Sequence, residues 1–137
     1  MTPMTHRVFV YGSLKRGCSN HHFLQQAKFI GPSVTVPRYR MLESAVPIFF
    51  PVLLPDPDGR QVAGEVYDVD DETLAALDGL ERIATGAYTR EVIEVTTASG
   101  EGDVELACIY VGGARWAQSG CPVYGRTNAA GALDWRR

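Results

Sequence analysis

Short runs of β-branched, aromatic and aliphatic residues, separated by glycine and proline, make up most of the hydrophobic pattern of this chain. Such runs are typical of strands. Strands are therefore expected at about 7–12, 28–36, 39–43, 62–69, 88–97 and 103–112. The glycine-rich residues 98–102 would join the last two strands as a hairpin loop. The proline-containing segment 44–59 predicts a structured loop or an edge strand, because proline cannot donate a backbone hydrogen bond.

Two segments have the features of short helices. One lies near residues 20–27. The other begins at the acidic cluster 70–72, where negative charge favours the amino-terminal end of the helix dipole. Leucines at positions 74, 77 and 80 then form an apolar stripe, and Asp78-Gly79 supplies a stop signal for this helix.

Strands outnumber helices, and no alternation of strand and helix is sustained along the chain. This order predicts the α+β class, with a mainly β sheet or a small barrel that carries the helices on its outside. A length of 137 residues suits one domain, residues 1–137. Within it, residues 114–137 are rich in glycine and alanine and weakly patterned, which predicts a wrapping or partly mobile tail.

The net charge and the composition exclude some classes of binding partner and some cellular locations. A net charge of −3 and a pI near 5.5 argue against nucleic acid as the main partner. No stretch approaches the length of a membrane span, and the first six residues lack the hydrophobic core of a signal peptide. Three cysteines, odd in number and far apart, fit reduced thiols. We therefore expect a cytoplasmic location.

The strand near the amino terminus ends abruptly at Gly12-Ser13, after Tyr11, and Leu14 and the cations Lys15 and Arg16 follow at once. A strand that opens into such a turn can hold a small anion, such as a carboxylate, through its backbone amides. The alternative is an ordinary strand end with a tight turn.

Glu81 is the ionisable residue with the most informative surroundings. It follows Leu77 by four positions and lies between Leu80 and Ile83, so its carboxylate has apolar neighbours whether or not the helix continues. Burial raises the pKa of a carboxyl group towards neutrality, as a general acid or base requires. The alternative is a solvated glutamate at a helix end.

Two other reactive patterns are weaker. The motif Cys18-x-x-His21-His22 offers too few ligands for a zinc site, and no second cysteine or histidine pair accompanies it. We therefore predict no metal. Ser13 lacks the G-x-S-x-G context of a serine nucleophile, and a base for it cannot be placed from the sequence.

Several aromatic residues are candidates for walls or packing. Tyr88 and Arg90 are two apart on a predicted strand and so share one face, where they would shape a pocket or close a barrel. Trp116, Tyr124 and Trp135 are expected to be packing residues or exposed anchors of the tail.

Four blocks of sequence together resemble the gamma-glutamylcyclotransferase-like superfamily, and most closely its gamma-glutamylamine cyclotransferase branch. They are Val8 to Gly17 followed by Asn20-His21, then Gly64-Glu65-Val66-Tyr67, Leu77-Asp78-Gly79-Leu80-Glu81 and Tyr88-Thr89-Arg90. The resemblance covers roughly residues 7–31 and 46–112 and does not extend to the tail.

The resemblance implies a small mixed β-barrel with flanking short helices, and an enzyme that needs no cofactor. Its substrate would be a small gamma-glutamyl amine or gamma-glutamyl amino acid, and its products 5-oxoproline and the free amine. Carried over by position, Glu81 would be the catalytic acid or base. Tyr11, Gly12, Ser13 and Leu14 would form the substrate-binding loop, and we add Tyr88 to that set. The resemblance indicates no oligomeric state.

In such a reaction the α-amine of the substrate attacks its own γ-carbonyl, so the protein supplies no nucleophile. Two alternatives remain. One is a small-molecule-binding or regulatory domain that retains the fold without turnover. The other is an amidohydrolase that uses Ser13 or Cys18, which requires a base within hydrogen-bond reach. A buried Glu81 that faces the same pocket as residues 11–14 would favour the cyclotransferase.

Overall fold

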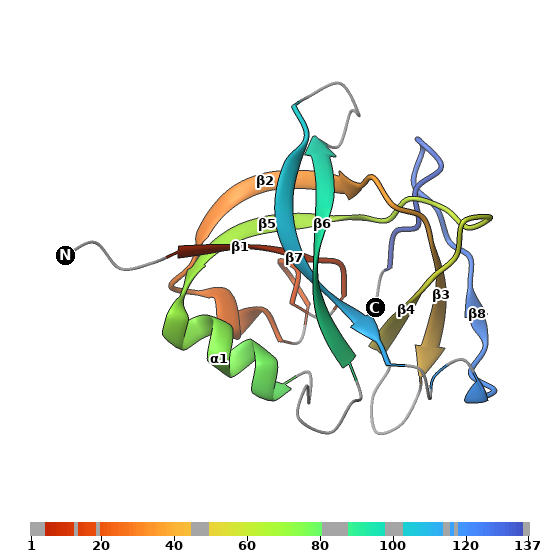
Figure 1. The fold of residues 1–137 in the computed structure, drawn as a ribbon, viewed down its shortest axis with the longest axis horizontal. Coiled ribbons are helices and arrows are strands. Elements are labelled where there is room, and N and C mark those ends of the chain that lie inside the picture. The colour runs from red at the N-terminus through yellow and green to blue at the C-terminus, as the bar shows by residue number, and fades with distance from the viewer. Residues whose placement is uncertain are drawn as a thin grey trace.

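Five strands close into a barrel in the order β1-β5-β2-β6-β7 (Figure 1). The computed structural model describes residues 5–12, 14–18, 20–44, 50–80, 88–97, 103–113, 116 and 118–135. The barrel strands are β1 (Thr5–Val10), β2 (Lys28–Thr35), β5 (Ala63–Asp70), β6 (Tyr88–Thr97) and β7 (Glu105–Gly112). All neighbouring pairs are antiparallel except β1 and β7, which run parallel, so the barrel is mixed.

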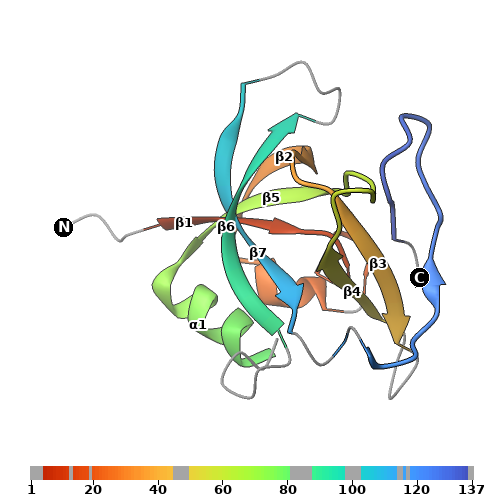
Figure 2. The same ribbon diagram turned by 45° about the vertical axis from the view of Figure 1, so that its right-hand side comes forward.

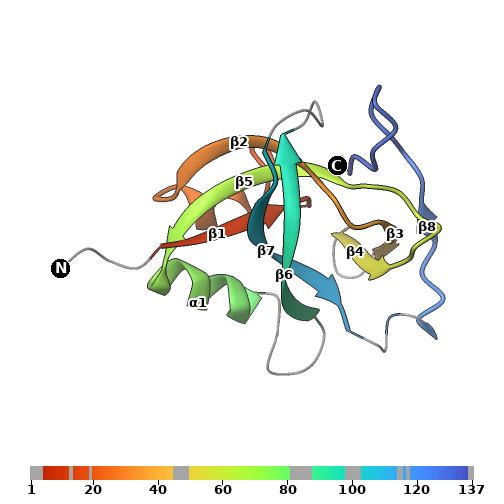
Figure 3. The same ribbon diagram turned by 45° about the horizontal axis from the view of Figure 1, so that its top comes forward.

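A second sheet of three strands extends the barrel, in the order β4-β3-β8. Its strands are β3 (Tyr39–Ser44), β4 (Phe50–Pro55) and β8 (Val123–Tyr124). A short 3-10 helix, η1 (His21–Leu24), and the α-helix α1 (Asp71–Leu80) complete the described elements. In all three views, α1 and the three-stranded sheet lie on opposite sides of the molecule (Figure 2, Figure 3).

Alternate residues of β1 belong to two different hydrophobic clusters. Val8 and Val10 pack with Leu74 and Leu77 of α1, so this cluster fills the space between the helix and the outside of the barrel. Phe9, on the opposite face of β1, packs in a cluster without helix residues, which joins the inward-facing residues of the barrel to residues of the three-stranded sheet and the tail. Because hydrophobic residues of β1 alternate between the two clusters, α1 covers the face of β1 that carries Val8 and Val10.

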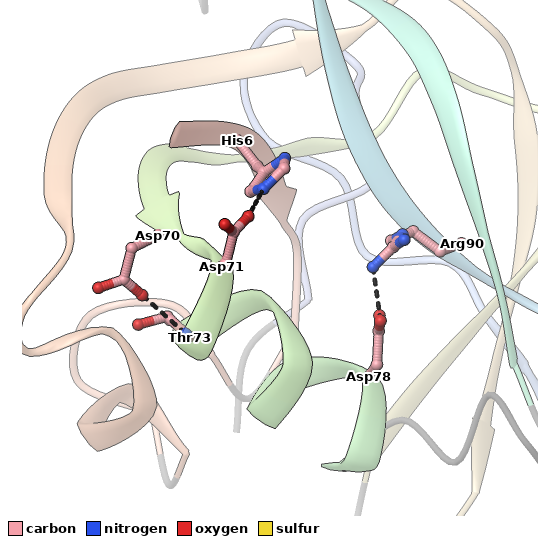
Figure 4. A network of polar contacts seen from close by, with 6 residues as sticks. All are labelled: His6, Asp70, Asp71, Thr73, Asp78 and Arg90. Atoms are coloured by element: carbon pink, nitrogen blue, oxygen red, sulfur yellow. Dashed lines mark hydrogen bonds and ion pairs between the residues drawn. The ribbon is translucent and has the colours of Figure 1, made fainter. Parts of the chain in front are cut away.

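Polar contacts at the amino-terminal end of α1 fix where this helix begins. Asp70 precedes the first helical residue, and its Oδ1 accepts a hydrogen bond of 2.7 Å from the backbone amide of Thr73 (Figure 4). This cap lowers the pKa of the Asp70 carboxyl group. Asp71 pairs with His6 of β1 at 2.5 Å, so the helix start is also tied to the barrel.

The structure confirms the α+β class and most of the predicted elements. The strand predicted at 88–97 has these bounds, whereas β1 ends at Val10 and the helix predicted at 20–27 is only the 3-10 turn η1. The stop signal at Asp78-Gly79 was wrong, because α1 includes both residues and reaches Leu80. The hairpin loop predicted at 98–102 lies outside the described residues.

Over its described length the tail runs beside the three-stranded sheet (Figure 1). Its β8 pairs with β3, and Trp135, only 2% exposed, packs in the same cluster as Phe9. Cys18, Cys108 and Cys121 are free thiols. Across the described residues, no helix has both the length and the apolar character that a membrane crossing requires.

Candidate active site

A tight turn follows β1, at the end of the strand that was predicted to open into a binding loop. The Lys15 amide donates a hydrogen bond of 3.1 Å to the Gly12 carbonyl oxygen, which closes what we call the 12–15 turn. A β-turn of this kind leaves the amide of its third residue, here Leu14, outside its closing hydrogen bond. The turn can therefore direct that amide towards an anion.

Gly12 lies against β4. A Cβ atom at Gly12 would be 2.6 Å from Cγ of Pro51, which is closer than carbon atoms can pack. The carbonyl oxygen of the same Pro51 accepts a hydrogen bond of 3.1 Å from the hydroxyl of Tyr88. Pro51 therefore brings together two of the predicted site residues, Gly12 and Tyr88.

Tyr11 and Tyr88 are buried, with 7% and 8% exposed. The Tyr11 hydroxyl donates to the Tyr110 carbonyl oxygen at 2.5 Å, as the Tyr88 hydroxyl does to Pro51. These hydroxyls thus join strands to one another. The Tyr88 ring packs in the same hydrophobic cluster as Leu14, and the Trp116 ring is tilted against it with the ring centres 6.4 Å apart. The Tyr11 ring packs in the other cluster.

Side chains from other elements hold the residues that follow the turn. Glu65 of β5 accepts a hydrogen bond of 2.9 Å from the Arg16 amide, and one of 3.1 Å from the Tyr67 hydroxyl. Burial, with the nearby Glu65 carboxylate, raises the pKa of Tyr67 to about 12. The Arg16 guanidinium lies 3.7 Å from the centre of the Phe29 ring, a cation–π contact.

His21, part of the weak metal motif, contacts the same turn. Its Nδ1 lies 3.0 Å from the carbonyl oxygen of Leu14. Among the described residues, no three histidine, cysteine, aspartate or glutamate side chains gather closely enough to hold a metal ion. The contact of His21 is thus with the backbone of the predicted binding loop.

The carboxyl-terminal end of α1 is clamped to the barrel. The Asp78 carboxylate accepts a hydrogen bond from Arg90 of β6 at 2.5 Å (Figure 4). It accepts another from the Tyr110 hydroxyl of β7 at 2.7 Å. Burial and the Asp78 carboxylate raise the pKa of the Tyr110 hydroxyl, so it remains a donor. For Arg90, burial lowers the pKa, but Asp78 and Tyr110 outweigh that effect and raise it.

One hydrophobic cluster connects these features. Leu14 of the turn, Tyr88 of β6 and Leu77 of α1 are all buried in it, and Leu80, the last residue of α1, packs against it. Glu81 follows Leu80 directly in the chain. Glu81 and Ser13 lie outside the described residues, so their predicted roles remain predictions.

Pro51 and Tyr110 were missed at the sequence level, and Lys15 was expected only as a cation of the turn, without its contact to the tail. Pro51 joins Gly12 to Tyr88, Tyr110 joins Tyr11 to Asp78, and Lys15 reaches the tail. The alternating pattern of β7 carries a signal for Tyr110, because it places this residue on the face opposite the barrel interior. No local sequence pattern predicts that Pro51 lies against Gly12 or that Lys15 contacts the tail.

Comparisons with known proteins identify the family of the chain. A model of the family described as gamma-glutamyl cyclotransferase, AIG2-like, matches residues 8–135. Gamma-glutamylaminecyclotransferase C of Danio rerio is 40% identical over 115 residues, which cover 77% of this chain and 74% of the relative. Gamma-glutamylaminecyclotransferase A of the same organism is 42% identical over 109 residues, which cover 75% of this chain and 66% of the relative.

Among solved structures, an AIG2-like protein from Mus musculus superposes with a TM-score of 0.73 at 28% identity, and the match covers 97% of both chains. The predicted resemblance is confirmed, and the family match extends into the tail, which the sequence motifs did not cover. The chain belongs to the gamma-glutamyl cyclotransferase, AIG2-like family.

Proposed function

We propose that this chain is a cyclotransferase that converts a small gamma-glutamyl amine or gamma-glutamyl amino acid into 5-oxoproline and the free amine. One observation carries the proposal. A single hydrophobic cluster holds Leu14 of the turn, Tyr88 of β6 and the end of α1 that leads into Glu81. The names of the Danio rerio relatives support the gamma-glutamyl part of the substrate.

In the proposed reaction the α-nitrogen of the substrate attacks its own γ-carbonyl carbon. A new C–N bond closes the five-membered ring, and the bond from that carbon to the leaving nitrogen breaks. The α-ammonium group loses two protons, and the amine leaves as an ammonium ion after gaining two. Glu81 can carry these protons in turn, which requires a pKa near neutrality.

The 12–15 turn would position the substrate. In the proposal its amides hold the substrate carboxylate or stabilise the oxyanion that develops on the γ-carbonyl oxygen. The buried ring of Tyr88, which packs with Leu14 of the turn, would form a wall against which the substrate folds. Because the attack is intramolecular, holding the substrate in the ring-closing geometry supplies a large share of the rate enhancement.

A panel of gamma-glutamyl amines, dipeptides and amides tests the proposal. We expect at least one compound to give 5-oxoproline and its free amine in equal amounts, measured by chromatography of both products. Binding of a gamma-glutamyl compound without turnover would instead support a non-catalytic domain. Release of glutamate in place of 5-oxoproline would support hydrolysis and contradict the proposal.

Replacing Tyr110 by phenylalanine tests the clamp on α1. The substitution removes the hydroxyl that donates to Asp78 and keeps the backbone carbonyl that accepts from Tyr11. We expect the free energy of unfolding to fall by about 1–3 kcal/mol, since the lost hydrogen bond involves a charged acceptor. Chemical denaturation measures this loss.

A double-mutant cycle identifies the interaction responsible. Asp78→Ala combined with Tyr110→Phe should cost less than the sum of the two single substitutions, because each removes the hydrogen bond between these side chains. Strict additivity would show that this hydrogen bond contributes nothing to stability.

A further inference from the structure

We propose that Lys15 is a positioning residue, through which the carboxyl-terminal segment 123–135 holds the 12–15 turn in its binding geometry. The proposal goes beyond the reaction itself, because it makes the tail a structural part of the site. It rests on the proposed function for its kinetic test. Its structural test is independent of activity.

Lys15 is a buried cation at the end of the turn, with 8% of the residue exposed. Its Nζ donates a hydrogen bond of 2.6 Å to the carbonyl oxygen of Trp135 and lies 3.4 Å from Oδ1 of Asp134. Both partners lie in the tail, about 120 residues further along the chain. A buried ammonium group is stable only where such partners replace water.

The same residue also closes the turn. The backbone amide of Lys15 donates to the Gly12 carbonyl oxygen, while its side chain reaches the tail. Lys15 is therefore held at both its backbone and its side chain, and its side-chain contacts restrict the residue whose amide closes the turn. Leu14, whose amide is proposed to face the substrate, is the immediate neighbour of Lys15.

The tail provides a rigid partner for Lys15. The Trp135 indole is buried in the same hydrophobic cluster as Phe9, and its Nε1 donates to the Glu43 carboxylate of β3 at 2.7 Å. The Tyr124 hydroxyl donates to the Asp134 carbonyl oxygen at 3.0 Å. Leu133 exchanges backbone hydrogen bonds of 2.8 Å with Gln61 and Ala63, which lead into β5.

These contacts form a continuous connection from the sheets to the turn. Glu43 of β3 and Gln61 before β5 fix the tail, the tail fixes the ammonium group of Lys15, and Lys15 fixes the turn. The hydrogen bond to the Trp135 carbonyl oxygen and the ion pair with Asp134 both link the tail to the 12–15 turn through the Lys15 ammonium group. Loss of the Lys15 ammonium should therefore loosen the turn while leaving the helix end and its Asp78 clamp in place.

The test compares Lys15→Met and Lys15→Arg with a matched control, Lys28→Met. Lys28 is an exposed lysine at the start of β2. The first readout is hydrogen–deuterium exchange of the backbone amides in residues 11–18. We expect faster exchange there in Lys15→Met, a smaller change in Lys15→Arg because a buried cation remains, and no change in Lys28→Met.

The second readout is kinetic, on the gamma-glutamyl compound that the wild-type protein turns over fastest. We expect kcat/KM of Lys15→Met to fall by about 10- to 100-fold, because a small displacement of the groups that position a substrate lowers the rate by this order. The loss should lie mainly in a raised KM, and the pH profile of kcat should keep its shape because the acid or base is untouched. Lys15→Arg should recover part of the loss.

A second variant keeps the proposal testable if Lys15→Met does not fold. Tyr124→Phe removes the hydroxyl that holds Asp134 and leaves the turn itself unaltered. We expect a smaller rise in exchange at residues 11–18, transmitted through the tail. A rise confined to the tail would overturn the proposal.

The outcomes separate this proposal from the proposed function. Unchanged exchange at residues 11–18 in a folded Lys15→Met protein overturns the proposal, whatever the activity. Faster exchange with an unchanged KM overturns the positioning role and leaves a purely structural one. If the wild-type protein turns over no gamma-glutamyl compound, the proposed function fails, while the exchange measurement still decides whether the tail holds the turn.

Discussion

Glu81→Gln is expected to lower the rate of 5-oxoproline release by about 10²- to 10⁴-fold, the usual contribution of a general acid or base. Glutamine keeps the size of the side chain and its hydrogen-bonding capacity but cannot carry a proton. Substrate positioning by the 12–15 turn would remain, so KM should change little. Steady-state kinetics on the best gamma-glutamyl compound measures both parameters.

Glu72→Gln provides the matched control, because Glu72 is an exposed glutamate in the first turn of the same helix. It should retain wild-type activity. Circular dichroism and the denaturation midpoint of both variants should match those of the wild type. Full activity in a folded Glu81→Gln protein would refute the proposed mechanism.

Strand positions were predictable because the barrel buries alternate residues of most of its strands. The clearest case is β6, in which Ile93 and Val95 face the interior while Val92 and Glu94 are exposed. The end of α1 was not predictable in this way. The helix passes through Gly79 where Asp78 is held by Arg90 and Tyr110, which lie 12 and 32 residues further along the chain. A stop signal read from a few neighbouring residues contains no information about partners so far along the chain.

The candidate site was predictable in part for the same reason. The sequence motifs identify Tyr11, Gly12, Leu14 and Tyr88. The structure packs Leu14 with Tyr88 and brings Gly12 and Tyr88 to Pro51, whereas the Tyr11 ring packs in the other hydrophobic cluster. The connecting residues come from distant segments. Lys15 reaches Trp135 across 120 positions, and Tyr11 reaches Tyr110 across 99. Only the closed barrel and the wrapped tail bring these pairs together.

Gly12→Ala is expected to lower both stability and activity, because the added methyl group would lie 2.6 Å and 2.9 Å from Cγ and Cδ of Pro51. The proline ring is rigid, so the turn or β4 must move. Such overpacking costs about 1–3 kcal/mol of unfolding free energy.

The same displacement carries the turn amides away from the substrate, so kcat/KM should fall by more than the loss of folded protein explains. Gly125→Ala is the matched control, since a Cβ atom there meets no heavy atom within 4 Å. It should leave both quantities unchanged. Chemical denaturation and kinetics on the same preparations separate the two effects. A Gly12→Ala protein with wild-type stability and activity would show that the turn can move away from Pro51 without cost, and that this contact does not set the geometry of the site.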